Sequence, residues 1–138
     1  MTDSISILII EGEPNLRGNL ASALTEVGFI VADVRDYPEA LLKIDEFKPD
    51  IAIVDEALSN RAGREACYQL HSALGIPVIV LGEDSSEEVW ERVTEVEADL
   101  YLIKPFSYRE LVARIKAILR RYKKAAGGDG CENRNKGF

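Results

Sequence analysis

The hydrophobic positions of the chain follow two alternating patterns. Short runs of Ile, Val and Leu, such as "ILII" and "IAIV", are separated by longer segments in which apolar residues recur every three or four positions. The short runs predict buried β-strands, and the longer segments predict amphipathic helices. Five such strand–helix units follow one another, which is typical of an α/β domain with a parallel sheet. Strands are expected at residues 5–10, 29–34, 50–54, 77–81 and 100–103.

The predicted strands are too uniformly apolar for a sheet with one wet face, so helices should cover both faces of a doubly wound sheet. These helices are expected at residues 14–27, 37–47, 62–73, 86–96 and 107–122. Pro14 suits a first helical turn, and Gly28 and Gly75 suit left-handed caps. Ser86 and Ser107 can accept hydrogen bonds from the first free amides of their helices.

The last predicted helix closes the domain. Its core-facing stripe consists of Leu111, Ile115, Ile118 and Leu119. Beyond it, "AAGGDGCENRNKGF" is rich in glycine and has no periodicity, which is typical of a flexible tail or linker. We therefore expect one domain over residues 1–123 and a tail over 124–138.

Composition narrows the class of protein. Of the 138 residues, 46% are hydrophobic and 30% are charged, and no apolar run approaches the roughly 18–20 residues that span a bilayer. The polar N-terminus lacks a secretory signal, so we expect a cytoplasmic protein. Cys67 and Cys131 show no metal-binding spacing and are expected to be reduced. The net charge of −7 argues against nucleic acid binding by this segment alone.

Charged residues follow the predicted strands at their carboxyl ends, where ligands bind in doubly wound sheets. Glu11 and Glu13 follow the first strand, Asp55 and Glu56 the third, Glu83 the fourth and Lys104 the fifth. The carboxyl ends of parallel strands share one edge of the sheet. The pattern therefore predicts a pocket in which several acids face one lysine.

Five sequence features carry a family resemblance. They are the acidic end of "ILIIEGEP", "PDIAIVD" ending in Asp55, Gly63 eight residues later, "IPVIVL", and "ADLYLIKPF" containing Lys104. Over residues 5–122 the chain resembles the receiver domain of two-component response regulators. The resemblance implies a flavodoxin-like (βα)5 fold with strand order 2-1-3-4-5, and a signalling module rather than an enzyme.

The resemblance also implies roles for the pocket residues. Asp55 would accept a phosphoryl group from a histidine kinase or phosphotransfer protein, Lys104 would pair with the phosphate, and a cis bond before Pro105 would aim that lysine inward. Such transfer depends on positioning and on neutralising the phosphoryl oxygens, here by Mg²⁺ and Lys104. The simpler alternatives are a cap at the strand end for Asp55 and a solvent-exposed loop lysine for Lys104.

The acidic pair departs from the family pattern. Gly12 replaces the second acid, which is normally a direct Mg²⁺ ligand, so Glu11, Glu13 and Asp55 remain as candidate ligands of a weakened site. Without a cation, a phosphoryl group on Asp55 would lie beside Glu11 and Glu13, and two like charges about 4 Å apart repel by roughly 4 kcal/mol at an effective dielectric near 20. Alternatively, the two glutamates form a solvated acidic loop at a helix N-terminus.

Two further departures affect signal output. Gly82 stands where the family has a threonine or serine whose hydroxyl bonds the phosphate, and Tyr101 stands where an aromatic ring reports that contact. Tyr101 could equally be a core aromatic with a wet hydroxyl.

The resemblance also implies a dimer surface. Related receivers attached to DNA-binding domains dimerise through helix 4, strand 5 and helix 5 by means of charge pairs. Glu110 and Arg114 of that surface are present in this chain, but the charged residues expected to pair with them are replaced by Trp90 and Leu100. This pair could form an apolar patch for homodimerisation, or Trp90 could fold back on its own domain. His71, the only histidine, has no companion acid in its spacing and is expected on a helix surface.

Three functions are consistent with the sequence. The first is a divergent receiver that is phosphorylated weakly or acts without phosphorylation, and that signals to a downstream effector or output domain. The second is a fully competent Mg²⁺-dependent receiver of a DNA-binding regulator, with Glu11 and Glu13 holding the metal. The third is a flavodoxin-like cofactor or nucleotide carrier, although "EGEPN" offers acids where a phosphate cradle needs amides.

Overall fold

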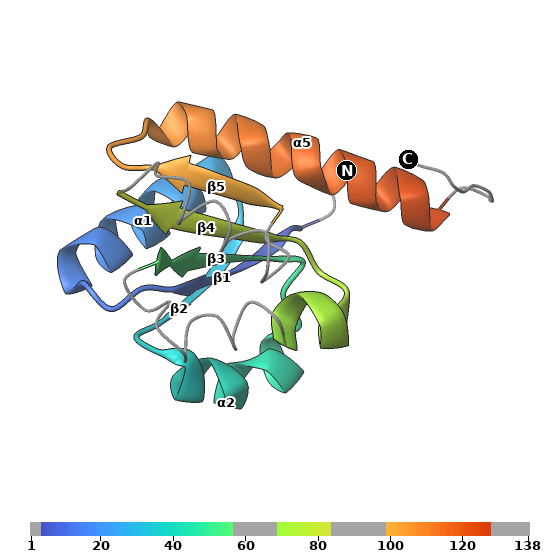
Figure 1. The fold of residues 1–138 in the computed structure, drawn as a ribbon, viewed down its shortest axis with the longest axis horizontal. Helices are drawn as coiled ribbons and strands as arrows, with labels where there is room; N and C mark the ends of the chain where they lie inside the picture. Colours follow the sequence, from blue (N-terminus) through green and yellow to red (C-terminus); the bar gives the residue numbers. More distant parts are fainter. Residues whose placement is uncertain (1–3, 57–68, 84–98, 128–138) are drawn as a thin grey trace.

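The computed structural model of the chain describes residues 4–56, 69–83 and 99–127, and Figure 1 shows their arrangement. A central parallel sheet is ordered β2-β1-β3-β4-β5, which confirms the predicted fold class and strand order. The strands are β1 (Ser6–Ile10), β2 (Ile30–Val34), β3 (Ile51–Asp55), β4 (Val78–Gly82) and β5 (Leu100–Ile103). Each boundary lies within one residue of its predicted position. Because β3 and β4 end one residue later than predicted, Asp55 and Gly82 are the last residues of their strands.

The described helical segments are α1 (Pro14–Val27), α2 (Tyr37–Phe47), the short π-helical segment η2 (Gln69–Ala73) and α5 (Tyr108–Gly127). The first two have the predicted bounds. Only the end of the predicted helix at 62–73 is described. The predicted helix at 86–96 with its cap Ser86, together with Gly63, Cys67 and Cys131, lies outside the described residues.

Helix α5 ends five residues later than predicted, at Gly127. The added segment reads "KKAAG", and Lys and Ala have high helix propensity, so the helix runs on until a glycine ends it. The first residues of the predicted tail are therefore helical. Residues 128–138 lie outside the described part of the chain.

The predicted caps are present wherever the structure describes them. Pro14 opens α1, and Gly28 ends it with a left-handed φ of 116° while its amide donates to carbonyls of the last turn. Gly75 also has a positive φ, of 70°. At the start of α5, Ser107 Oγ accepts a 2.9 Å hydrogen bond from the amide of Glu110.

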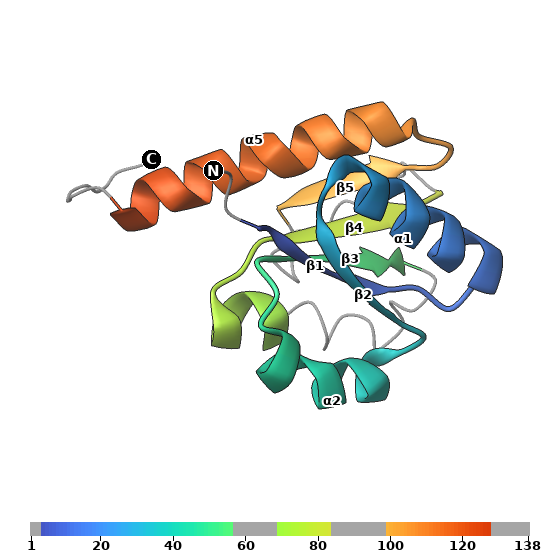
Figure 2. The same ribbon diagram turned by 180° about the vertical axis from the view of Figure 1, so that it is seen from behind.

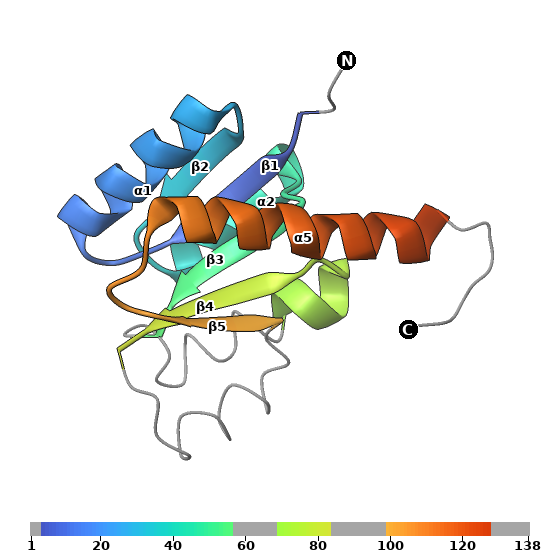
Figure 3. The same ribbon diagram turned by 90° about the horizontal axis from the view of Figure 1, so that it is seen from above.

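Helices cover both faces of the sheet, as the uniformly apolar strands predicted. Helices α1 and α5 lie on one face, as Figures 2 and 3 show, and α2 and η2 lie on the other. The α5 stripe packs as predicted: Leu111, Ile115 and Ile118 are buried, and Leu119 is partly buried against the same cluster. The sheet is therefore a rigid platform whose carboxyl edge positions the pocket residues. None of the described helices is long and apolar enough to cross a membrane.

Candidate functional site

Asp55 and Lys104 meet at the carboxyl edge of the sheet. Asp55 is the last residue of β3 and only 2% exposed, and Lys104 directly follows β5. The Lys104 ammonium donates a 2.7 Å hydrogen bond to Asp55 Oδ2. The Lys104–Pro105 peptide bond is cis, as the resemblance implied. Lys104 is therefore not a lysine that extends freely into solvent.

The ion pair shifts the titration of the lysine. Burial alone would lower the pKa of Lys104, but its hydrogen bond to Asp55 and the nearby carboxylates of Glu11 and Glu83 outweigh this effect and raise the pKa. The ammonium consequently stays charged through the physiological range. A fixed positive charge beside a carboxylate suits the site to an anionic reactant.

Glu11, directly after β1, is the second buried acid of the site, and 2% of its surface is exposed. Its Oε2 accepts a 3.1 Å hydrogen bond from the amide of Glu13, whereas its Oε1 is buried and has no hydrogen-bond donor within the described segments. Burial and a hydrogen bond shared with Asp55 raise the pKa of Glu11 to about 8.

The raised pKa of Glu11 changes the expected electrostatics of the pocket. At neutral pH this carboxyl mostly retains its proton when no metal is bound. Glu11 and Asp55 then carry together about one negative charge, which Lys104 balances. Repulsion between the Glu11 and Asp55 side chains is thereby avoided, but a cation that needs Glu11 as a ligand must first displace a proton.

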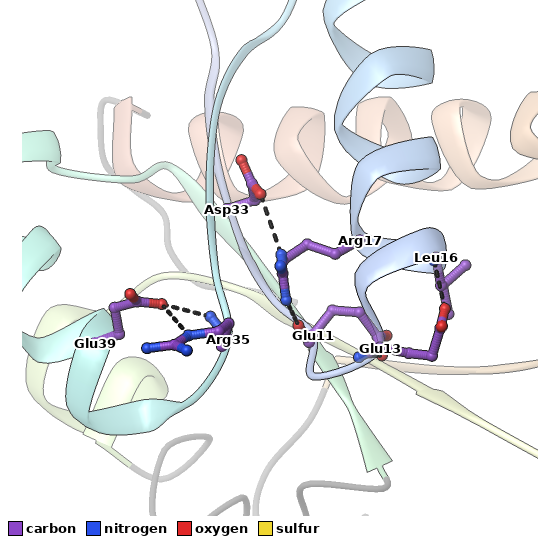
Figure 4. Close-up of polar contacts among 7 residues, drawn as sticks. All are labelled: Glu11, Glu13, Leu16, Arg17, Asp33, Arg35 and Glu39. Atoms are coloured by element: carbon purple, nitrogen blue, oxygen red, sulfur yellow. Dashed lines mark hydrogen bonds and ion pairs between the residues drawn. The ribbon is translucent and has the colours of Figure 1, made fainter.

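Glu13 occupies a different position from Glu11. It caps α1, and its Oε1 accepts a 2.6 Å hydrogen bond from the amide of Leu16, as Figure 4 shows. This is the arrangement of an acid at a helix N-terminus, one of the two roles expected from the sequence. Within residues 4–56, 69–83 and 99–127, no three acidic, His or Cys side chains are grouped so that they could hold a metal ion.

Arg17 supports the loop that carries Glu11, and sequence analysis did not identify it. Its Nη1 donates a 2.9 Å hydrogen bond to the backbone carbonyl of Glu11, and its Nε lies 3.4 Å from Asp33 Oδ2 on β2 (Figure 4). The only sign of this role in the sequence was that Arg17 lies one helical turn after Glu13.

A separate contact in Figure 4 joins Arg35 to Glu39 at the start of α2.

Gly82 is the last residue of β4, and the ring of Tyr101, the second residue of β5, reaches it. Tyr101 is 5% exposed and belongs to the core cluster on the α2 face of the sheet. Its hydroxyl donates a 2.7 Å hydrogen bond to Oε1 of Glu56, the residue after Asp55. Tyr101 is thus a core aromatic, but its hydroxyl is bonded to protein. Glu56 was expected at this edge of the sheet, but its bond to Tyr101 was not predicted, because an acid after a strand is usually just solvated.

The predicted dimer surface is described only in part. Trp90 lies outside the described residues. Leu100 is partly buried against the core that α1 and α5 cover. Glu110 and Arg114 lie 3.9 Å apart on the exposed surface of α5, where they form an i,i+4 pair with each other.

His71 lies in the helical segment η2 with 28% of its side chain exposed, but the expectation that it has no companion acid was wrong. His71 Nε2 lies 3.2 Å from the Tyr122 hydroxyl and 3.8 Å from Asp99 Oδ2. The Tyr122 hydroxyl donates a 2.7 Å hydrogen bond to Asp99 Oδ1, and burial and this bond raise the Tyr122 pKa. The acid is 28 positions away in the chain, so local spacing could not reveal it.

Known proteins share both the sequence pattern and the fold. A family profile described as "Response regulator receiver domain" matches residues 7–116. The sensory transduction protein RegX3 of Mycobacterium tuberculosis is 40% identical over 124 residues, which are 90% of this chain and 52% of that protein. The probable transcriptional regulator ycf27 of Guillardia theta is 36% identical over 122 residues, 87% of this chain and 47% of that protein. The chain thus spans about half the length of these curated relatives.

Solved structures agree with these relatives. A CheY-like response regulator receiver domain protein from Methanospirillum hungatei superposes with a TM-score of 0.80 at 25% identity, covering 88% of this chain and 98% of that one. A two-component response regulator from Clostridium difficile gives a TM-score of 0.79 at 29% identity, covering 86% and 98%. With the matching profile, the strand order and the pocket of Asp55 and Lys104, these comparisons show that the chain belongs to the response regulator receiver domain family of two-component signalling.

Proposed function

We propose that Asp55 is the phosphoryl acceptor of this receiver and that its phosphorylation is inefficient because the metal site lacks one carboxylate. The observation that carries the proposal is the 2.7 Å contact between the Lys104 ammonium and Asp55, with the buried Glu11 carboxyl beside it. In the transfer, an Asp55 oxygen forms a bond to phosphorus while the bond from phosphorus to the donor atom breaks. The electron pair of that bond leaves with the donor, and Lys104 offsets charge on the phosphoryl oxygens.

The pocket fits Mg²⁺ in the kind of its donors but not in their number. Glu11 and Asp55 offer hard carboxylate oxygens, Gly12 offers none, and Glu13 is engaged in capping α1. Glu11 and Asp55 would hold the ion, with water and backbone carbonyls completing its shell. The bound ion would supply additional positive charge at the phosphoryl oxygens. We expect weak binding, because two carboxylates replace three and one of them must lose a proton.

The family match favours this receiver function over a flavodoxin-like cofactor carrier. Receiver domains interact with histidine kinases and output domains, and we propose the same classes of partner here. The relatives named as a sensory transduction protein and a transcriptional regulator support an output domain that controls transcription. Homodimerisation through the predicted fourth helix, β5 and α5 belongs to the same proposal, with Trp90, Leu100, Glu110 and Arg114 in the interface.

The acceptor role is tested by labelling with a radioactive small phosphodonor across a range of Mg²⁺ concentrations. We expect slow, Mg²⁺-dependent labelling that is lost in Asp55→Asn and retained in Asp45→Asn, which removes an exposed acid on α2. Labelling of the Asp55→Asn variant equal to wild type would exclude Asp55 as the acceptor. Rapid labelling at low Mg²⁺ would instead support the competent receiver, a second candidate favoured by the buried Oε1 of Glu11, to which no donor in the described segments is bonded.

A further inference from the structure

Tyr101 and Gly82 occupy one continuous surface of the sheet. In the β4–β5 register Tyr101 is paired with Val80, and Gly82 lies two residues further along β4. Residues two apart on a strand face the same side of a sheet, so Val80 and Gly82 share the face on which Tyr101 is buried. The Tyr101 ring therefore extends along β4 from Val80 to the strand end.

The Tyr101 hydroxyl fills the space that a side chain at position 82 would need. A Cβ atom placed on Gly82 would collide with the Tyr101 hydroxyl and would lie 2.5 Å from both Tyr101 Cζ and Glu56 Oε1. Real Cβ atoms do not approach other heavy atoms so closely. A side chain at position 82 therefore requires the Tyr101 ring, the Glu56 carboxylate or the strand end to shift.

Glu56 fixes the end of the ring. Its Oε1 accepts the 2.7 Å hydrogen bond from the Tyr101 hydroxyl, and a bond to a carboxylate is stronger than one between neutral groups. The bond satisfies a hydroxyl that is otherwise enclosed by the core, where Tyr101 lies among Val54, Val78 and Val80. Packing, a missing side chain and a hydrogen bond thus all favour one ring position.

We propose that Gly82 and Glu56 form a built-in lock that holds Tyr101 inward with no ligand at Asp55. Two features of the sequence determine the position of the Tyr101 ring beside the end of β4: the absence of a side chain at position 82, and the acid Glu56 that follows Asp55. The parts of the lock are Gly82, Glu56 and Tyr101, and none of the contacts that hold the ring requires a phosphoryl group on Asp55.

The lock is tested on the unphosphorylated protein by limited nitration with tetranitromethane and mass spectrometry of each tyrosine. In wild type, Tyr101 should react at least about tenfold more slowly than Tyr108, which is 36% exposed, because the locked ring must first open locally. In Gly82→Ala the rate at Tyr101 should rise toward that of Tyr108. Gly18→Ala is the matched control, since a Cβ there meets nothing within 4 Å, and it should leave Tyr101 protected.

Two further variants test the other parts of the lock. Glu56→Gln keeps an acceptor oxygen and should keep Tyr101 protected, whereas Glu56→Ala removes it and should accelerate nitration. Asp55→Asn should leave the protection of Tyr101 unchanged. An unprotected Tyr101 in wild type, continued protection in a folded Gly82→Ala, or loss of protection in Asp55→Asn would each overturn the proposal.

A double-mutant cycle covers the case in which Gly82→Ala unfolds. Tyr101→Leu removes the ring that a Cβ at position 82 would strike. The Gly82→Ala change should therefore lower the Tm much more in wild type than in the Tyr101→Leu background. Equal losses of Tm in the two backgrounds would show that the ring and position 82 are not coupled, and would contradict the lock.

Discussion

The side chains of Lys104 and Asp55 form a nearly buried ion pair at the end of β3, with a nitrogen–oxygen distance of 2.7 Å and side-chain exposures of 20% and 3%. The partners are 49 residues apart in the chain, so the pair links β5 to the centre of the sheet. Glu11 adds a second carboxyl to this pair. The charge balance of the pocket thus depends on the ammonium of Lys104 and on the proton of the Glu11 carboxyl.

Replacing Lys104 by Met should destabilise the protein at pH 8, where the wild-type ammonium is fully charged. Without the ammonium, Asp55 is left buried without this partner, and Glu11 cannot ionise without adding a second charge. Breaking a fully buried pair costs roughly 3–5 kcal/mol, and the partial exposure of Lys104 reduces the expected loss to about 2 kcal/mol at pH 8. Urea unfolding measures it.

The control for Lys104→Met is the double variant with Asp55→Asn. Because the carboxylate charge is then absent, the double variant should lose less stability than Lys104→Met alone, which gives a positive coupling between the sites. Additive losses would mean that the two side chains do not interact in solution.

The stability of the metal-free protein should depend on the protonation of Glu11. Its folded-state pKa is about 8, against an ordinary value of 4.5, so between these values the folded state holds a proton that the unfolded state releases. The folded state binds more protons in this window, and its stability must fall as the pH rises from about 4.5 to about 8. Below this window the Glu11 contribution is fully present.

The Glu11→Gln variant isolates this titration, because it keeps the shape and removes the ionisable group. The unfolding free energies of wild type and Glu11→Gln are measured in chelator from pH 4 to pH 9, and the difference between them should change with pH as Glu11 ionises. Wild type should lose stability relative to the variant as the pH rises. A constant difference over the whole range would show that Glu11 has an ordinary pKa.

Adding a carboxylate at position 12 should strengthen the metal site. Gly12 is exposed, so Gly12→Asp introduces no buried clash, and a third carboxylate near Glu11 and Asp55 should raise Mg²⁺ affinity by about tenfold or more. Phosphoryl labelling at limiting Mg²⁺ should increase with it. Isothermal titration with Mg²⁺ measures the affinity, and Gly18→Asp on the exposed side of α1 controls for added charge. Unchanged labelling in Gly12→Asp would support a site in which Glu11 and Glu13 already suffice.

The fold could be predicted from sequence because its signals are local. Strand β3 reads "IAIVD" and is buried throughout, and α1 is bounded by Pro14 and Gly28, so the hydrophobic period and the caps specify each element directly. The charged residues that follow the strands could be predicted to meet at the carboxyl edge, because all strands of a parallel sheet end at the same edge. The approach of Asp55 and Lys104 was therefore predictable as a location, although not as a distance.

The details that sequence could not predict arise from contacts between distant segments. Glu13 and Glu11 are two positions apart, yet one caps a helix in solvent while the other is buried and has a raised pKa. Local pattern does not distinguish them, because burial depends on what the rest of the fold places over each side chain. The filling of the Gly82 position by Tyr101 likewise depends on the register of β4 and β5.

Gly18, inside a helix, and Gly28, in a left-handed cap, should respond in opposite ways to substitution by alanine. Gly18 lies inside α1 with open space around it, so Gly18→Ala should stabilise the protein by about 0.5–1 kcal/mol through helix propensity. Gly28 has a φ of 116°, which strains any side chain, so Gly28→Ala should destabilise by about 1 kcal/mol or more. Urea unfolding of both variants checks the opposite signs. A stabilising Gly28→Ala would mean that α1 does not end in the left-handed cap.

The hydrogen bond between Tyr122 and Asp99 should stabilise the far end of α5 without affecting the pocket. Tyr122→Phe removes the hydroxyl that donates to Asp99 Oδ1 and that lies against His71, while Asp99 Oδ2 still accepts the amide of Val78. A half-buried bond of this kind contributes about 1–1.5 kcal/mol, and Tyr108→Phe, which alters an exposed ring, should cost less than about 0.5 kcal/mol.

The position of this bond in the sheet makes the Tyr122 prediction specific. Asp99 immediately precedes β5, whereas Lys104 follows its last residue, so the bond and the pocket lie at opposite ends of the same strand. Tyr122→Phe should therefore lower stability and speed amide exchange in the last turns of α5 while leaving phosphoryl labelling at the wild-type rate. Equal stability of Tyr122→Phe and Tyr108→Phe would show that the bond adds nothing, and slower labelling would show that the two ends of β5 are coupled.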